Sequence, residues 1–206
     1  MKKAKYLLLK NMNEDVKNIF KNYKVVIAGG AITSVFTSVP INDYDVYIKS
    51  LNDLNVIISK LEEIGYEIVF DTDNAISMKM NKETKIQLIK KLIGKSADEI
   101  VNEFDFTVCM GAYDFETDKF ILHDRFLYDL ARKELIFNTN AKYPICSMYR
   151  TRKYQKRGFT LPGVEIIKIA LAINNLNLES YADLKEQLQG IDTLFLKDVT
   201  DVLMTD

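Results

Sequence analysis

The 206-residue chain is poor in several residue types, and each shortage removes a class of protein. It has no tryptophan, three prolines, one histidine and two cysteines, which leaves no disulfide framework and too few ligands for a zinc site. A metal ion would therefore be a hard cation held by carboxylates. No apolar run reaches the roughly 18 residues of a membrane span. The net charge of −1 excludes a globally basic surface for nucleic acid.

The N-terminal apolar segment, Tyr6 to Leu9, is too short for the core of a signal peptide. We therefore expect a soluble cytoplasmic protein (in the host cytoplasm if a phage encodes it), with neither a membrane nor DNA as partner. Apolar residues make up 48% and charged residues 28%, as in ordinary globular proteins. A chain of this length forms one domain, or one domain with an appended segment.

Hydrophobic periodicity predicts a mixed first part and an all-helical last part. The expected strands cover residues 24–28, 44–48, 66–70, 75–80, 84–89, 104–113 and 119–122. The expected helices cover residues 12–23, 31–36, 51–65, 124–132, 145–157, 163–175 and 181–188, with a further short helix opened by the capping box of Ser96 and Glu99. We expect an α+β fold with a catalytic domain over residues 1–137 and a helical segment over residues 138–206.

Two aspartates, Asp43 and Asp45, stand two residues apart in one expected strand. That spacing puts both carboxylates on one face, while Tyr44 and Val46 face the core. Because adjacent carboxylates repel each other, a divalent cation is their natural neutraliser, and Mg²⁺ is usually held by one or two carboxylates plus substrate phosphates. Without further support, the same pattern is also that of a solvated turn.

A third aspartate, Asp105, lies in the expected strand 104–113, whose aromatic and aliphatic residues alternate with polar ones. A carboxylate in such a strand carries a burial penalty unless it is paired or bound to metal. Three aspartates on strands would build a two-metal site, which binds a triphosphate, activates a hydroxyl and stabilises the leaving pyrophosphate.

Gly29 and Gly30 follow the first expected strand and precede a short helix that carries Ser34. Paired glycines let the backbone approach a phosphate, and amides at the helix N-terminus bind the anion. The pattern is neither a P-loop nor G-x-G-x-x-G, which disfavours a kinase or a dinucleotide-binding enzyme.

In this order, the glycine pair, the Asp-x-Asp strand and Asp105 resemble the DNA polymerase β-like nucleotidyltransferase superfamily. Three segments are similar to the head and neck of the tRNA CCA-adding enzyme and poly(A) polymerase family: residues 28–45, residues 103–110 (EFDFTVCM) and residues 150–161 (RTRKYQKRGFTL). The resemblance implies a nucleotidyltransferase fold, a mixed sheet with flanking helices, followed by a small helical neck. The base-reading motif E-D-x-x-R is missing from residues 160–206, which argues against templated CCA addition.

The resemblance implies that Asp43, Asp45 and Asp105 hold Mg²⁺ or Mn²⁺ and are catalytic. In the wider superfamily the position of Asp105 is a metal ligand, whereas in the CCA-adding family it is associated with the ribose; we favour metal. Gly29, Gly30 and Ser34 would contact the β- and γ-phosphates.

Residues 142–157 hold six Lys or Arg and no acid. On a helix Arg150, Lys153 and Arg157 would share one face, suited to a triphosphate or an acceptor phosphate. The other interpretations are a solvated helix face or a dock for the acidic residues 179–206.

The sequence thus predicts a metal-dependent nucleotidyltransferase that transfers a nucleotidyl group from an NTP to a hydroxyl and releases pyrophosphate. An RNA 3′ end, such as that of a tRNA, is the favoured acceptor; a small molecule or a protein hydroxyl, as in a toxin-type enzyme, is the alternative. The rival hypothesis is an inactive binding module for nucleotide, RNA or a partner protein.

Overall fold

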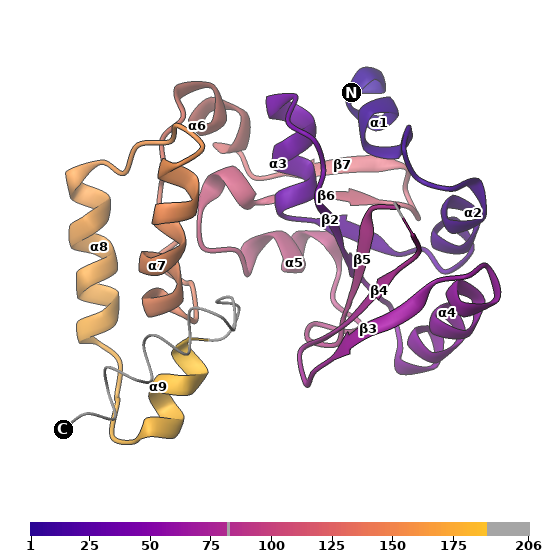
Figure 1. Cartoon of the computed structure of the whole chain (residues 1–206). Coiled ribbons are helices and arrows are strands. Elements are labelled where there is room, and N and C mark those ends of the chain that lie inside the picture. Colours follow the sequence, from indigo (N-terminus) through magenta and orange to yellow (C-terminus); the bar gives the residue numbers. More distant parts are fainter. Residues whose placement is uncertain (82, 189–206) are drawn as a thin grey trace. The chain divides into compact units, whose positions relative to one another are not determined.

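The computed structural model describes residues 1–81 and 83–188 of the chain (Figure 1). Its strands are β1 (Val26–Ala28), β2 (Asp43–Tyr47), β3 (Glu67–Asp71), β4 (Ala75–Lys79), β5 (Lys85–Ile89), β6 (Gly111–Asp114) and β7 (Lys119–Leu122). Its helices are α1 (Lys2–Leu9), α2 (Glu14–Asn22), α3 (Gly30–Thr37), α4 (Leu51–Glu63), α5 (Ala97–Asn102), α6 (Phe126–Arg132), α7 (Pro144–Gln155), α8 (Gly163–Asn174) and α9 (Tyr181–Gln187). The predicted α+β class is confirmed.

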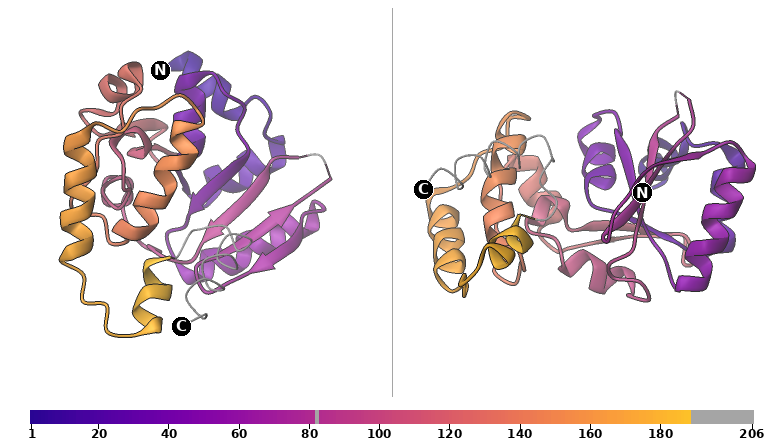
Figure 2. Two further views of the ribbon diagram at one scale, coloured as in Figure 1. Left: turned by 60° about the vertical axis from the view of Figure 1, so that its left-hand side comes forward. Right: turned by 60° about the horizontal axis from the view of Figure 1, so that its bottom comes forward.

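The described strands form one seven-stranded mixed sheet in the order β3-β4-β5-β2-β1-β6-β7. Only the β2–β5 pair is parallel among these neighbours, and the other pairs are antiparallel. Helices α3 and α5 pack on the sheet, as Figures 1 and 2 show from three directions. The strands β1 and β2 lie at its centre, so the residues at their ends are held by neighbours on both sides.

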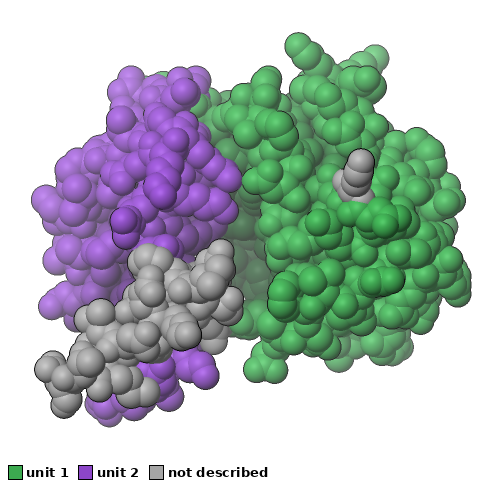
Figure 3. Space-filling view, viewed as in Figure 1, with its two compact units in different colours: residues 1–104, 108–130 green, residues 105–107, 131–206 purple. Residues whose placement is uncertain are grey.

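The chain divides into two compact units (Figure 3). The first unit contains residues 1–104 and 108–130, and with them the whole sheet. The second contains residues 105–107 and 131–206. The expected domain boundary at residue 137 stays a prediction.

The core of the first unit includes a cluster beneath α5. Tyr47 of β2 packs there with Ala28 of β1 and Ile100 of α5. Helix α5 begins at the capping box that the sequence predicts: Ser96 Oγ accepts from the Glu99 amide, and the Glu99 carboxylate accepts from the Ser96 amide. Asp43, Asp45 and Tyr47 lie on one face of β2, because side chains two residues apart along a strand share a face. That face is therefore acidic at the start of the strand and apolar at its end.

In the described part of the second unit, helix α7 packs against α8 and α9. An aromatic cluster joins its two sequence segments: the rings of Phe106 and Phe137 lie 6.1 Å apart, and those of Phe106 and Tyr154 lie 6.0 Å apart. The short segment 105–107 is also tied by a bridge between Phe106 and Phe137.

The predicted strand over residues 104–113 is wrong in its first half. Residues Thr107–Cys109 form a 3₁₀ turn, and β6 begins only at Gly111. The physical reason lies in Phe106, which is fully buried in the aromatic cluster of the second unit instead of pairing in the sheet. Helix α1 was not predicted; Tyr44 of β2 holds it by donating to the Leu8 carbonyl at 2.9 Å.

Candidate active site

The start of β2 carries the two predicted carboxylates on one face of the sheet. Asp43 and Asp45 are half-buried, while Tyr44 and Val46 between and after them are 1% and 0% exposed. This alternation confirms that both carboxylates point to the same side. Ala28 at the end of β1 is paired with Asp45, so the glycine pair that follows Ala28 leaves the sheet at the same end.

Strand β5 adds two polar residues to this face. The sequence pattern already gives Gln87 as the nearest polar neighbour of the aspartates, whereas Lys85 was not predicted. In the parallel register Lys85 stands beside Asp43, and Gln87 stands beside Asp45. The Lys85 ammonium lies 3.7 Å from Asp43 Oδ2. The Gln87 amide is assigned the orientation in which both its oxygen and its nitrogen form hydrogen bonds. In that orientation the nitrogen donates to Asp45 Oδ1 at 2.8 Å. The alternation of these two residues with Ile86 and Leu88 indicates a strand with one polar face, but the sequence does not show which strand it pairs with.

The Gly29-Gly30 turn is shaped by two different constraints. Gly29 has φ +74°, and a Cβ there would lie 2.7 Å from a ring carbon of Phe104, so only glycine fits. Gly30 opens α3, and a Cβ there would meet nothing within 4 Å. The fold therefore requires glycine at position 29 but leaves open space in front of position 30, which suits a ligand close to the backbone.

Helix α3 begins without a side-chain cap at Gly29, whereas Ser50 and Ser96 cap α4 and α5. In this first turn the Ile32 amide donates to the Gly29 carbonyl at 3.0 Å, but no side-chain oxygen caps the helix, which favours an anion at its start. Ser34 is 8% exposed on the same helix. Its neighbour Thr33 is structural: the hydroxyl donates to the Val108 carbonyl at 2.7 Å.

In the second unit Asp105 is buried and ion-paired. It is 6% exposed, and its Oδ2 lies 3.0 Å from Arg150 Nη1. Its Oδ1 has no hydrogen-bond partner among the described residues. The pair with Arg150 was not predicted, and the expectation that Asp105 sits on a strand is wrong. Its convergence with Asp43 and Asp45 stays a prediction.

The predicted basic face on α7 needs correction at Arg157. The helix ends at Gln155, and a turn that includes Gly158 at φ +84° follows. Arg157 lies beyond the helix, with its guanidinium carbon 6.0 Å from the centre of the Tyr154 ring. Arg150 and Lys153 remain on α7. Most of the acidic segment 179–206 lies outside the described residues.

The donor chemistry of the β2 pair fits a hard cation. Within residues 1–81 and 83–188 no group of three or more His, Cys, Asp or Glu is close enough to hold a metal ion. Asp43 and Asp45 supply two adjacent carboxylates, and Mg²⁺ bound together with substrate phosphates needs no more than one or two. The half-exposed pair is thus chemically suited to such an ion.

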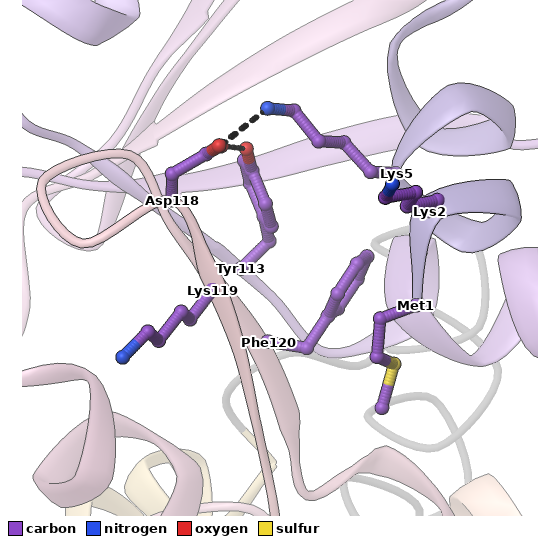
Figure 4. A pocket seen from close by; sticks show the side chains of 7 residues that line it. All are labelled: Met1, Lys2, Lys5, Tyr113, Asp118, Lys119 and Phe120. Carbon is purple, nitrogen blue, oxygen red and sulfur yellow. Dashed lines mark hydrogen bonds and ion pairs between the residues drawn. The ribbon is translucent and has the colours of Figure 1, made fainter.

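A separate pocket of about 500 Å³ lies between α1 and the β6–β7 hairpin (Figure 4). Its lining contains none of the predicted site residues. Lys5 and the Tyr113 hydroxyl both point at Asp118, with the Lys5 nitrogen at 2.6 Å. These two partners lower the pKa of Asp118, and burial with the same carboxylate raises the pKa of Tyr113. The ion pair between Lys5 and Asp118 therefore joins α1 to the hairpin.

None of the helices in the described part of the chain has the length and apolar character needed to cross a membrane.

Comparison with solved structures shows the fold. A CCA-adding enzyme in complex with CTP matches with a TM-score of 0.67 at 15% identity, over 90% of this chain and 50% of that one. The Thermotoga maritima CCA-adding enzyme complexed with tRNA matches with a TM-score of 0.62 at 14% identity, over 84% and 45%. The chain therefore has the nucleotidyltransferase fold.

Sequence comparison shows the family. The model of the Gabija anti-defense 2 family matches residues 1–133. The protein "Gabija anti-defense 2" of Bacillus phage SPbetaL7 is 37% identical over 182 residues, which cover 87% of this chain and 45% of that relative. The chain thus spans less than half the length of the relative it matches. On both findings, this chain belongs to the Gabija anti-defense 2 family.

Proposed function

We propose that the chain is a metal-dependent nucleotidyltransferase that serves to counter the Gabija defence. The observation that carries the proposal is the Asp43–Asp45 pair at the strand end where the Gly29-Gly30 turn leaves the sheet. A carboxylate pair beside uncapped helix amides suits a triphosphate with its cation. The family name supplies the biological setting, and the fold supplies the reaction class.

In the proposed reaction an acceptor hydroxyl oxygen attacks the α-phosphorus of the NTP. The bond from the α-phosphorus to the oxygen that bridges to the β-phosphorus breaks, pyrophosphate leaves, and the hydroxyl proton passes to a base or to water. The cation, when bound, would neutralise phosphate charge and lower the pKa of the hydroxyl. Asp43 and Asp45 would hold it. Gly30 would let the backbone approach the β- and γ-phosphates, with Gly29 fixing the turn and Ser34 adding a hydroxyl.

The second unit would contribute binding groups. The ion pair with Arg150 already neutralises Asp105, which makes this carboxylate a poorer cation ligand. We therefore propose that the Asp105 carboxylate binds a substrate hydroxyl, such as that of the ribose, rather than the cation. Its Oδ1 is buried and lacks a partner among the described residues, so this contact requires that the atom become accessible when substrate binds. Arg150, Lys153 and Arg157 are proposed to bind triphosphate or acceptor phosphates, since guanidinium groups match phosphate oxygens. An RNA 3′ end remains the proposed acceptor.

A second candidate function is a binding module that has lost turnover. The observation in its favour is on β5, where Lys85 and Gln87 rather than a carboxylate stand beside the aspartates. Such a module would bind a nucleotide or a component of the defence without catalysing a reaction.

The test is incubation with each α-labelled NTP, Mg²⁺ or Mn²⁺, and extracts from cells that carry the Gabija defence. The proposal expects metal-dependent labelling of one acceptor class, identified by its sensitivity to ribonuclease or protease. The Asp43→Asn variant should abolish the labelling, while Asp98→Asn, at an exposed position on α5, should leave it unchanged. If no acceptor is labelled with any NTP, the binding module is the better account.

A further inference from the structure

Lys85 stands within the carboxylate face in a defined position. Its ammonium lies 3.7 Å from Asp43 Oδ2 and 3.0 Å from the Gln87 amide oxygen. That amide is itself held on two sides, by Ser77 Oγ at 3.2 Å and by Asp45 Oδ1 at 2.8 Å. A chain of contacts therefore runs from one carboxylate through Gln87 to the lysine beside the other.

The register of the sheet keeps this arrangement in place. On β5, Lys85 and Gln87 alternate with the buried residues Ile86 and Leu88, so a shift by one residue would bury the lysine. The backbone of Lys85 is thus held in place by the sheet, while its ammonium is accessible. The side chains of Lys85 and Asp43 are 35% and 41% exposed. Exposed pairs of this kind are weak, so the lysine can exchange partners.

We propose that Lys85 is a positioning residue that occupies Asp43 until a triphosphate arrives. A free divalent cation would have to compete with the ammonium for Asp43. A triphosphate offers Lys85 an alternative anionic partner and thereby releases the carboxylate. The cation is then taken up together with the nucleotide rather than before it. This inference rests on the proposed function for its ligands.

Two opposite effects follow from removing the lysine charge. Without it the carboxylate pair is more negative, so the affinity for a free divalent cation rises. The same change removes a cation from the triphosphate, so the affinity for triphosphate falls. If Lys85 had only a structural role, its loss would weaken both the affinity for the cation and the affinity for triphosphate, because both ligands depend on the same sheet face.

The experiment titrates Mn²⁺ and, separately, inorganic triphosphate into the full chain and three variants by calorimetry. For Lys85→Met we expect about tenfold tighter Mn²⁺ binding, the effect of one charge a few ångströms away at a half-exposed site. Triphosphate binding should weaken by a similar factor. Lys85→Arg keeps the charge and should behave as the unmodified chain does. Lys79→Met, at an exposed position on β4, removes an equal charge outside the network and is the matched control.

Mn²⁺ binding by Lys85→Met that is unchanged or weaker, relative to the unmodified chain, overturns the inference. This includes the case in which neither protein binds Mn²⁺. Binding that appears only in Lys85→Met supports it. Nucleotidyl transfer is measured separately. If Lys85→Met binds Mn²⁺ more tightly and triphosphate more weakly, but the unmodified chain transfers no label, the result contradicts the proposed function alone.

Discussion

Two aspartate-bearing segments of this chain have nearly the same sequence pattern and different structures. Both residues 43–46 and residues 104–108 alternate polar with apolar side chains. The first segment lies in β2, which is paired with β1 on one side and β5 on the other. The second forms no sheet strand, because Phe106 is buried with Phe137 and Tyr154 in the second unit. Alternation therefore predicts a strand only where neighbouring strands complete it.

The difference in structure places the carboxylates in different surroundings. Asp43 and Asp45 are half-buried at an open strand end, with a lysine and an amide as neighbours. Asp105 is 6% exposed and carries its own counter-ion, Arg150. We expect the first pair to matter for chemistry and Asp105 to matter also for the stability of the second unit.

The largest expected effect is on turnover in Asp45→Asn. Loss of a cation-holding carboxylate should lower the transfer rate roughly 100-fold or more, as removal of a preorganised charge-stabilising group does. Asparagine keeps the side-chain shape and can still contact Gln87, so the melting temperature should hardly change. Single-turnover transfer of label and a thermal melt measure the two quantities. A variant that retains full activity would remove Asp45 from the site.

The second effect is on stability in Asp105→Asn. The change leaves the half-buried Arg150 without its carboxylate and should cost roughly 1.5–3 kcal/mol, the worth of a hydrogen bond to a charged group. Denaturant unfolding measures the free energy of unfolding of this variant and of Asp43→Asn, and the two values are compared. Equal stabilities of the two variants would contradict the distinction between the segments.

The two adjacent glycines should respond differently to alanine. Gly29→Ala forces a side chain to φ +74° and against Phe104, at a cost of about 1–3 kcal/mol. Gly30→Ala fits the fold and should change stability by less than about 1 kcal/mol, in the favourable direction, because alanine is the better helix former. It should nevertheless weaken triphosphate binding. Gly163→Ala, which also opens a helix with nothing within 4 Å of the new Cβ, is the matched control for both readouts.

The smallest effect is a pH dependence from the helix that leads into residues 104–110. The Ser96 amide and the Lys95 ammonium lower the pKa of Glu99 from 4.5 to about 2. Because the folded value is depressed, this stabilisation is present above pH 4.5 and is lost as the pH falls towards 2. Glu99→Gln keeps the hydrogen bonds of the capping box and should flatten that part of the stability profile, measured by thermal melts from pH 2 to pH 6. An unchanged profile would show that Glu99 does not contribute.

Sequence reasoning succeeded where local pattern and structure agree. The alternation around Tyr44 predicted the carboxylate face, and Ser96 with Glu99 predicted the start of α5, because strand faces and capping boxes are set by nearby residues. It failed where the partner is distant in sequence. Neither the pairing of Asp105 with Arg150 nor the position of Lys85 beside Asp43 has a local signal, since both depend on which segments fold together.

Gly29 illustrates a partial success. Its sequence context predicted a tight turn near a phosphate site, but the collision of a Cβ with Phe104 depends on residues 75 positions away and is visible only in three dimensions. Position 30 rather than position 29 is therefore the informative one to mutate.

The central claim is that Asp43 and Asp45 support transfer of a nucleotidyl group. The most direct measurement uses one NTP labelled in turn at the α- and the γ-phosphorus, with the acceptor fraction counted after removal of free nucleotide. The account predicts that the α-label enters the acceptor, that the γ-label is released as pyrophosphate, and that the Asp43→Asn, Asp45→Asn double variant does neither. Entry of the γ-label into the acceptor, or α-label transfer that survives in the double variant, would contradict it.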